Sequence, residues 1–235
     1  MVEQRPDRGA NWAYVSLVTV LPGLSLDPKL ALGVQFVVFE AVAIGLAAWY
    51  GLWQALPLAT AAIGISTLGS AVMVSLSERI HALDPPIRYR RLLFDSSVDV
   101  VMGVVAFIAL ATYLLVDAQG TGMGLFERLF GESLPAPAVY FTLLVAWDLA
   151  YRIGTGWWVS VTGLWRAVAF GDRFDGAAAA GYVRTDLLTM GFAGLQLVLV
   201  PVFWPDWFLV VVVLGHVGAV FVVSGLAIGV QRLRR

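Results

Sequence analysis

The chain has 235 residues, of which 60% are hydrophobic and 13% are charged, with a mean hydropathy of +0.83. Charged residues make up about 25% of a typical soluble domain, so the composition excludes an ordinary soluble fold and indicates a membrane protein. The 15 basic and 16 acidic residues nearly cancel, which excludes the basic surface that a nucleic-acid-binding protein needs. The absence of cysteine excludes disulfides, thiolate metal sites and cysteine nucleophiles.

Residues 1–30 are predicted to form a cytoplasmic or interfacial segment. Trp12 to Leu21 is apolar, but Pro22-Gly23 ends this run after little more than a dozen residues, which is too short to cross a bilayer. No basic region leads from the N-terminus into a small-residue cleavage site, so the segment does not resemble a signal peptide. We expect residues 12–24 to be interfacial or re-entrant.

Six apolar segments follow, each close to the roughly 20 residues that a helix needs to cross about 30 Å of hydrocarbon. They run over 31–53, 57–77, 96–116, 138–158, 182–203 and 207–229, and together they contain only six charged side chains. The sequence therefore predicts a single all-α domain, a polytopic bundle of six transmembrane helices.

The basic residues predict how this bundle is oriented. One set of loops and both termini carry Arg5, Arg8, Lys29, Arg79, Arg88, Arg90, Arg91, Arg166, Arg173, Arg232, Arg234 and Arg235, whereas the opposite loops carry only Arg128. Because cytoplasmic loops of membrane proteins are enriched in lysine and arginine, both termini are predicted to be cytoplasmic in a plasma-membrane protein.

Two of the longer loops have patterns of their own. The loop over 78–95 contains IRYRRLLF, an amphipathic segment whose Arg88, Arg90 and Arg91 would suit an anionic lipid surface. The loop over 117–137 contains GMGLFERLF, which is suited to a short helix beneath the headgroups. For both loops the plain alternative is a connector that rests on the bilayer.

The two halves of the chain share weak similarities. Glu40 precedes Trp49-Tyr50 by nine residues, and Asp148 precedes Trp157-Trp158 by the same interval. With three spans in each half, a duplication would produce an inverted 3+3 repeat, an arrangement found in many transporters. Apolar sequences also generate such matches by chance, so both explanations stay open.

A few ionisable residues are predicted to lie deep in the bilayer, where a charge requires a partner or a purpose. Glu40, Asp148 and His216 fall near the middle of their spans. Arg152 follows Asp148 at an i,i+4 spacing that permits an ion pair, and Asp99 lies deep enough to meet Arg152 from another helix. Arg184 and Asp186, at the start of the fifth span, are expected at the inner interface.

The candidate intramembrane polar cluster is therefore Glu40, Asp99, Asp148, Arg152 and His216. One interpretation is a proton or ion pathway, because three carboxylates share a single arginine and at least one of them would be protonated or bound to a cation. The other is a set of hydrogen bonds between helices that fixes their register. No metal-binding spacing, nucleotide-binding loop or hydrolase motif is present, so no catalytic residue, metal or cofactor is predicted.

Two runs resemble a family of uncharacterised multi-pass membrane proteins from haloarchaea: YRRLLFDSS (Tyr89 to Ser97) and WDLAYRIGTGWW (Trp147 to Trp158). The resemblance implies a polytopic protein of unknown function, and it supplies no catalytic or binding residues. A salt-loving host would suit a chain with one lysine and fourteen arginines.

The leading functional hypothesis is a small ion- or proton-coupled transporter or channel-like protein whose partners are membrane lipids and an ion or small solute. A non-transporting membrane scaffold or partner subunit is the alternative, and a lipid-modifying membrane enzyme is the third. Faces rich in small residues, such as Gly225 and Gly229, would suit helix packing or an oligomer.

Overall fold

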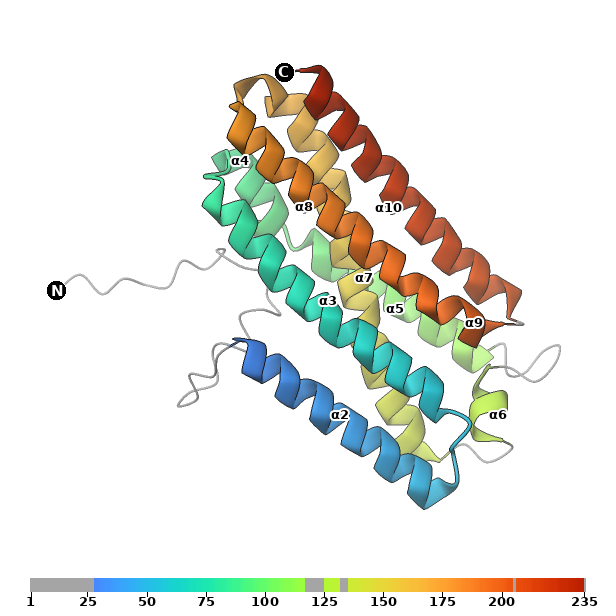
Figure 1. Ribbon diagram of the computed structural model, residues 1–235. Helices are drawn as coiled ribbons and strands as arrows, with labels where there is room; N and C mark the ends of the chain where they lie inside the picture. The colour runs from blue at the N-terminus through green and yellow to red at the C-terminus, as the bar shows by residue number, and fades with distance from the viewer. Residues whose placement is uncertain (1–27, 117–124, 132–134, 205, 235) are drawn as a thin grey trace.

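Long antiparallel helices make up most of the protein in the computed structural model, which describes residues 28–116, 125–131, 135–204 and 206–234 (Figure 1). No strand occurs among these residues. The interfacial segment expected over 12–24 lies outside them. The six long helices are α2 (Pro28–Tyr50), α3 (Leu56–Ala82), α5 (Val98–Val116), α7 (Ala136–Phe170), α8 (Gly176–Leu195) and α10 (Trp207–Leu233).

Short helical pieces connect the long ones. They are α4 (Ile87–Arg90), a π-helical turn η1 (Arg91–Asp95), α6 (Leu125–Phe130), the 3-10 turns η3 (Gly171–Arg173) and η4 (Gln196–Leu199), and α9 (Val200–Phe203). The carboxylates of Asp175 and Asp206 cap the first turns of α8 and α10 by accepting hydrogen bonds from Ala178 N and Leu209 N. Capping by an aspartate satisfies a backbone donor that would otherwise lack a partner.

Five helical segments of the described chain are long and apolar enough to cross a membrane. They are Leu30–Tyr50, Leu56–Ala82, Ile87–Leu115, Gly176–Phe203 and Trp207–Leu233. The segment expected over 138–158 is helical too, but it lies inside α7 and is not one of these five, since α7 carries Asp148, Arg152 and Arg166. The fold is thus an all-helical bundle of the kind found in membrane proteins.

The largest departure from the expected boundaries is also in α7. This helix continues without interruption from Ala136 to Phe170, twelve residues beyond the expected end. The added turns bury Val159, Ala167 and Phe170 against the other helices, and this packing stabilises the extension. Residues expected in a loop therefore lie inside the bundle.

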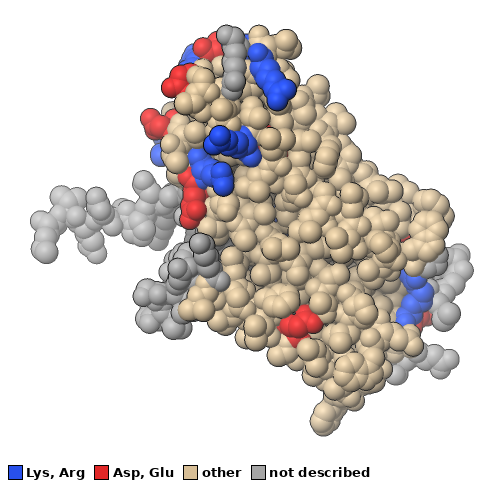
Figure 2. All heavy atoms as spheres, in the orientation of Figure 1, with Lys and Arg blue, Asp and Glu red and all other residues tan. Residues whose placement is uncertain are grey.

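On the face that Figure 2 shows, charged side chains gather toward the two ends of the bundle, and the surface between them is mostly uncharged. We call the end that holds α4, the α7–α8 connection and the close of α10 the α4 end, and the opposite end the α6 end. The exposed basic residues of the α4 end are Arg79, Arg88, Arg90, Arg91, Arg173, Arg232 and Arg234. At the α6 end the described residues include a single basic one, Arg128.

The two patterned loops both fold onto the bundle. In the first, Arg88, Arg90 and Arg91 are exposed, while Tyr89 and Leu93 are fully buried among α3, α7 and α8. In the second, the expected short helix is α6, and its Phe126 and Phe130 are buried. The apolar face of each segment therefore packs against protein.

Candidate functional site

α7 is the helix around which the others are arranged. It packs against α2, α3, α5, α8 and α10, and Figure 1 shows it passing behind α3 and α8. Its charged residues Asp148, Arg152 and Arg166 are 4%, 1% and 1% exposed. Since buried charges are stable only when they are paired or hydrogen-bonded, their partners define the candidate site.

The first partner set joins α7 to α3. Arg152 Nη2 lies 2.7 Å from Asp148 Oδ1, and Arg152 Nε donates to Asp148 Oδ2 at 3.1 Å. Ser66 on α3 donates its hydroxyl to Asp148 Oδ2 and accepts a hydrogen bond from Arg152 Nε at 3.2 Å. We call Ser66, Asp148 and Arg152 the Arg152 site, a neutral cluster made by two helices.

A glycine on α3 makes room for this arginine. A Cβ atom at Gly69 would lie 2.9 Å from Arg152 Cδ and 2.8 Å from Phe192 Cζ. Real Cβ atoms do not approach other carbons so closely, so a larger residue would displace the arginine or the ring. The Arg152 site therefore depends on a close approach of α3, α7 and α8.

Asp99 is buried beside this site and is held by a different residue. It is 3% exposed and accepts a hydrogen bond at 2.9 Å from the hydroxyl of Tyr151, the residue before Arg152. Glycines at the crossing bring α5 against α7, because a Cβ at Gly154 would lie 3.0 Å from Gly103 N. The hydrogen-bond donor to Asp99 is thus Tyr151, a neutral side chain that precedes Arg152 on α7.

The other two expected members lie on outer helix contacts. Glu40 on α2 accepts a hydrogen bond at 2.6 Å from Thr60 on α3, and its second oxygen, Oε2, has no hydrogen-bond partner among the described residues. His216 on α10 packs edge-on against the ring of Trp157, with centroids 6.4 Å apart. Asp148 and Glu40, which a duplication would pair, therefore have different surroundings, and the inverted repeat stays a prediction.

A second buried ion pair, which the sequence patterns did not reveal, joins α7 to α8. Arg166 Nη2 lies 2.8 Å from Asp186 Oδ2, and Asp186 is 2% exposed. The guanidinium also faces the rings of Tyr182 and Tyr89, at 4.3 and 5.6 Å from their centroids. We call Arg166, Asp186, Tyr182 and Tyr89 the Arg166 site.

The carboxylate of this pair comes from the middle of α8, which begins at Gly176. Arg184 is exposed, whereas Asp186 is buried in the bundle. The expected location of both residues at the inner membrane interface stays a prediction. Gly163 on α7 provides the space, since a Cβ there would lie 2.9 Å from Asp186 Oδ1. Arg166 was expected in a loop because a 21-residue span ends at 158, whereas α7 continues past it.

One pattern in the sequence indicates that Arg166 shares a helix face with Arg152, given that α7 continues past residue 158. Arg152, Val159, Gly163 and Arg166 recur at intervals of three, four or seven residues, which is one face of an α-helix. No group of three or more histidine, aspartate or glutamate side chains suited to a metal ion occurs in the part of the chain that the structure describes. The described site residues can therefore pair charges and donate hydrogen bonds, with Asp99 and Glu40 as carboxyls held by neutral hydroxyls.

Comparison with known proteins supplies a family and little more. Residues 7–227 match a family of unknown function, DUF7530, and the match covers both runs that carried the resemblance. No curated protein and no solved structure matches the chain.

Proposed function

The chain therefore belongs to this family of unknown function, and we propose that it is a non-transporting membrane scaffold or partner subunit. The observation that carries the proposal is that both arginines are almost fully buried and paired with a carboxylate. Arg152 lies 2.7 Å from Asp148, and Arg166 lies 2.8 Å from Asp186. The Arg152 site links α7 to α3, and the Arg166 site links α7 to α8. Paired in this way, the charges specify how three helices align, which is the role of polar groups between membrane helices.

We further propose that α7 is a sixth membrane span. Its ionisable residues are buried by neighbouring helices, so they do not meet lipid even though they lower the hydropathy of the segment. Six passes would bring both ends of the chain to one side of the membrane. The concentration of exposed arginines at the α4 end supports a cytoplasmic location for that end. The plasma membrane of a haloarchaeal host is proposed as the location because of the resemblance carried by the two sequence runs.

A second candidate, ion- or proton-coupled transport, is favoured by one observation. Asp99 and Glu40 are carboxyls in helices that are apolar enough to span, and the hydrogen bonds they accept come from the neutral hydroxyls of Tyr151 and Thr60. Carboxyl groups that accept hydrogen bonds from hydroxyls at membrane depth are the type of group that proton pathways use.

Flux measurements on reconstituted protein separate these two functions. We expect folded wild-type protein in phosphatidylglycerol vesicles to conduct protons, Na⁺ and K⁺ no faster than protein-free vesicles do. The double variant Asp148→Leu/Arg152→Met should also fold, because replacing both members of a buried pair by apolar residues is often neutral or stabilising. Proton or cation flux in the wild type that disappears in Asp99→Asn or Glu40→Gln would establish transport and overturn the scaffold proposal.

The orientation has a separate test. Because the natural chain contains no cysteine, a single introduced thiol reports its own accessibility without background. Arg88→Cys should react with an impermeant maleimide only after the membrane is opened, and Arg128→Cys should react in intact cells. The reverse pattern would contradict the proposed orientation.

A further inference from the structure

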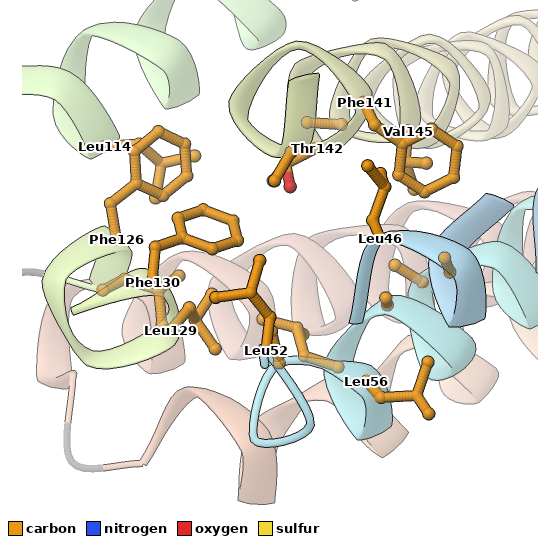
Figure 3. Close-up of a pocket in the computed structure, with 18 of the residues that line it drawn as sticks. Leu46, Leu52, Leu56, Leu114, Phe126, Leu129, Phe130, Phe141, Thr142 and Val145 are labelled. Atoms are coloured by element: carbon orange, nitrogen blue, oxygen red, sulfur yellow. The ribbon is translucent and has the colours of Figure 1, made fainter. Parts of the chain in front are cut away.

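An apolar cavity of about 110 Å³ lies at the α6 end of the bundle (Figure 3). Its walls come from α2, α3, α6 and α7, with additional residues from the ends of α5, α9 and α10. Among the residues that line it, Thr142 alone has a polar side chain, and the others are alanine, valine, leucine or phenylalanine. Figure 3 shows Leu46, Phe126, Phe130 and Thr142 around the space.

This lining determines what kind of molecule can occupy the cavity. A buried water needs two to four polar partners, and the cavity offers one hydroxyl. Cavities of about 150 Å³ lined by leucine, isoleucine and phenylalanine stay dry and bind small apolar molecules such as benzene. The cavity is therefore suited to a short stretch of hydrocarbon.

The position of the cavity indicates where such hydrocarbon would come from. The cavity is partly open, and α2 packs mainly along α3 and meets α7 over a short stretch only. Trp49 and Tyr140, which are 83% and 71% exposed, lie near the end of α2 and the start of α7. Trp53, which is 56% exposed, lies in the turn between α2 and α3. Exposed tryptophan and tyrosine mark the headgroup level of a bilayer, so the cavity lies just below that level, among lipid chains.

We propose that this cavity binds the hydrocarbon chain of a membrane lipid, which goes beyond the scaffold function. α6 closes one side of it, because Phe126 and Phe130 are buried and their rings pack 5.4 Å apart. The hydrocarbon chain of the lipid inserts beside Leu46 on α2 and Phe141 on α7. It fills a space whose apolar walls would otherwise lack contacts. The protein is thus assigned a lipid-binding site made by its own helices.

A photoreactive lipid tests the proposal. The probe is a phosphatidylglycerol with a diazirine near the end of one acyl chain, at one part in a hundred in phosphatidylglycerol vesicles that hold the full-length protein. After irradiation, peptide mass spectrometry locates the labelled residues. We expect labelling of the cavity residues of α2, α6 and α7 at least five times that of exposed positions such as Val37 and Val211, which face away from it.

Two filling variants and one matched control make the result specific. Ala47→Phe fills the cavity from α2, and Ala146→Leu fills it from α7, whereas Ala48→Phe adds the same ring at the exposed neighbouring position. Each filling variant that keeps the helical circular dichroism and melting temperature of the wild type should lose at least four fifths of the cavity labelling, and the control should lose none. If one filling variant unfolds, the other still decides. Equal labelling of cavity and exposed positions would overturn the proposal, and so would unchanged labelling in a folded filling variant. A third contrary result is cavity labelling that is removed by an unlabelled free isoprenoid chain but not by unlabelled phosphatidylglycerol.

Discussion

The two buried ion pairs of α7 have the same chemistry and are assembled in different ways. Asp148 and Arg152 lie one turn apart on a single helix, so the helix backbone alone brings them together. Arg166 and Asp186 are 20 residues apart on α7 and α8, and they meet only because these helices pack side by side. The Arg152 pair therefore orients an arginine within one helix, with Ser66 as its link to α3, whereas the Arg166 pair itself joins two helices.

The largest expected effect comes from breaking the pair that joins two helices. Arg166→Met leaves the Asp186 carboxylate buried without its cation, and we expect the free energy of unfolding in detergent micelles to fall by about 3–5 kcal/mol. Arg184→Met, at an exposed position two residues from Asp186, should change it little. The double variant Arg166→Met/Asp186→Leu should recover most of the loss, since it leaves no unpaired charge. Equal stabilities of Arg166→Met and Arg184→Met would show that the Arg166 site does not hold the helices together.

A smaller effect is expected from removing the link between the local pair and α3. Ser66→Ala deletes the hydroxyl that contacts both Asp148 and Arg152 but leaves the ion pair intact. Because hydrogen bonds to charged groups contribute about 1.5–3 kcal/mol, the free energy of unfolding should decrease by an amount in that range. Ser70→Ala, on the same helix, removes only a bond to the Ser66 carbonyl and should cost less. A loss from Ser66→Ala as large as that from Arg166→Met would remove the distinction between the two sites.

The smallest effect is expected from removing the hydroxyl of Tyr182 while its ring stays in the Arg166 site. The hydroxyl of Tyr182 has no hydrogen-bond partner among the described residues, while its ring lies 4.3 Å from the guanidinium carbon of Arg166. Tyr182→Phe keeps the ring and should change the unfolding free energy by less than about 1 kcal/mol. Tyr182→Leu also removes the cation–π contact and should lower it by about 2 kcal/mol or more. Similar losses for both variants would mean that the hydroxyl, and not the ring, stabilises the arginine.

The sequence predicted the site to different degrees at different residues. The i,i+4 spacing of Asp148 and Arg152 was sufficient to indicate their contact, because a helix fixes the positions of residues one turn apart. Spacing carried no such information for Asp99, which uses Tyr151, or for Glu40, which uses Thr60, because each contact depends on how two helices face each other. The functional role of the predicted cluster stays a hypothesis.

What the sequence by itself determined was the class of fold and the position of its long helices. An apolar run long enough to cross a bilayer has few alternatives to a helix, since every backbone group must find its hydrogen bond within the segment. The tertiary structure alone decided that α7 continues to Phe170, that Arg166 meets Asp186, and that an apolar cavity remains beneath α6. These features depend on contacts between residues far apart in the chain, and the helix periodicity of one segment does not specify which face of another segment it will meet.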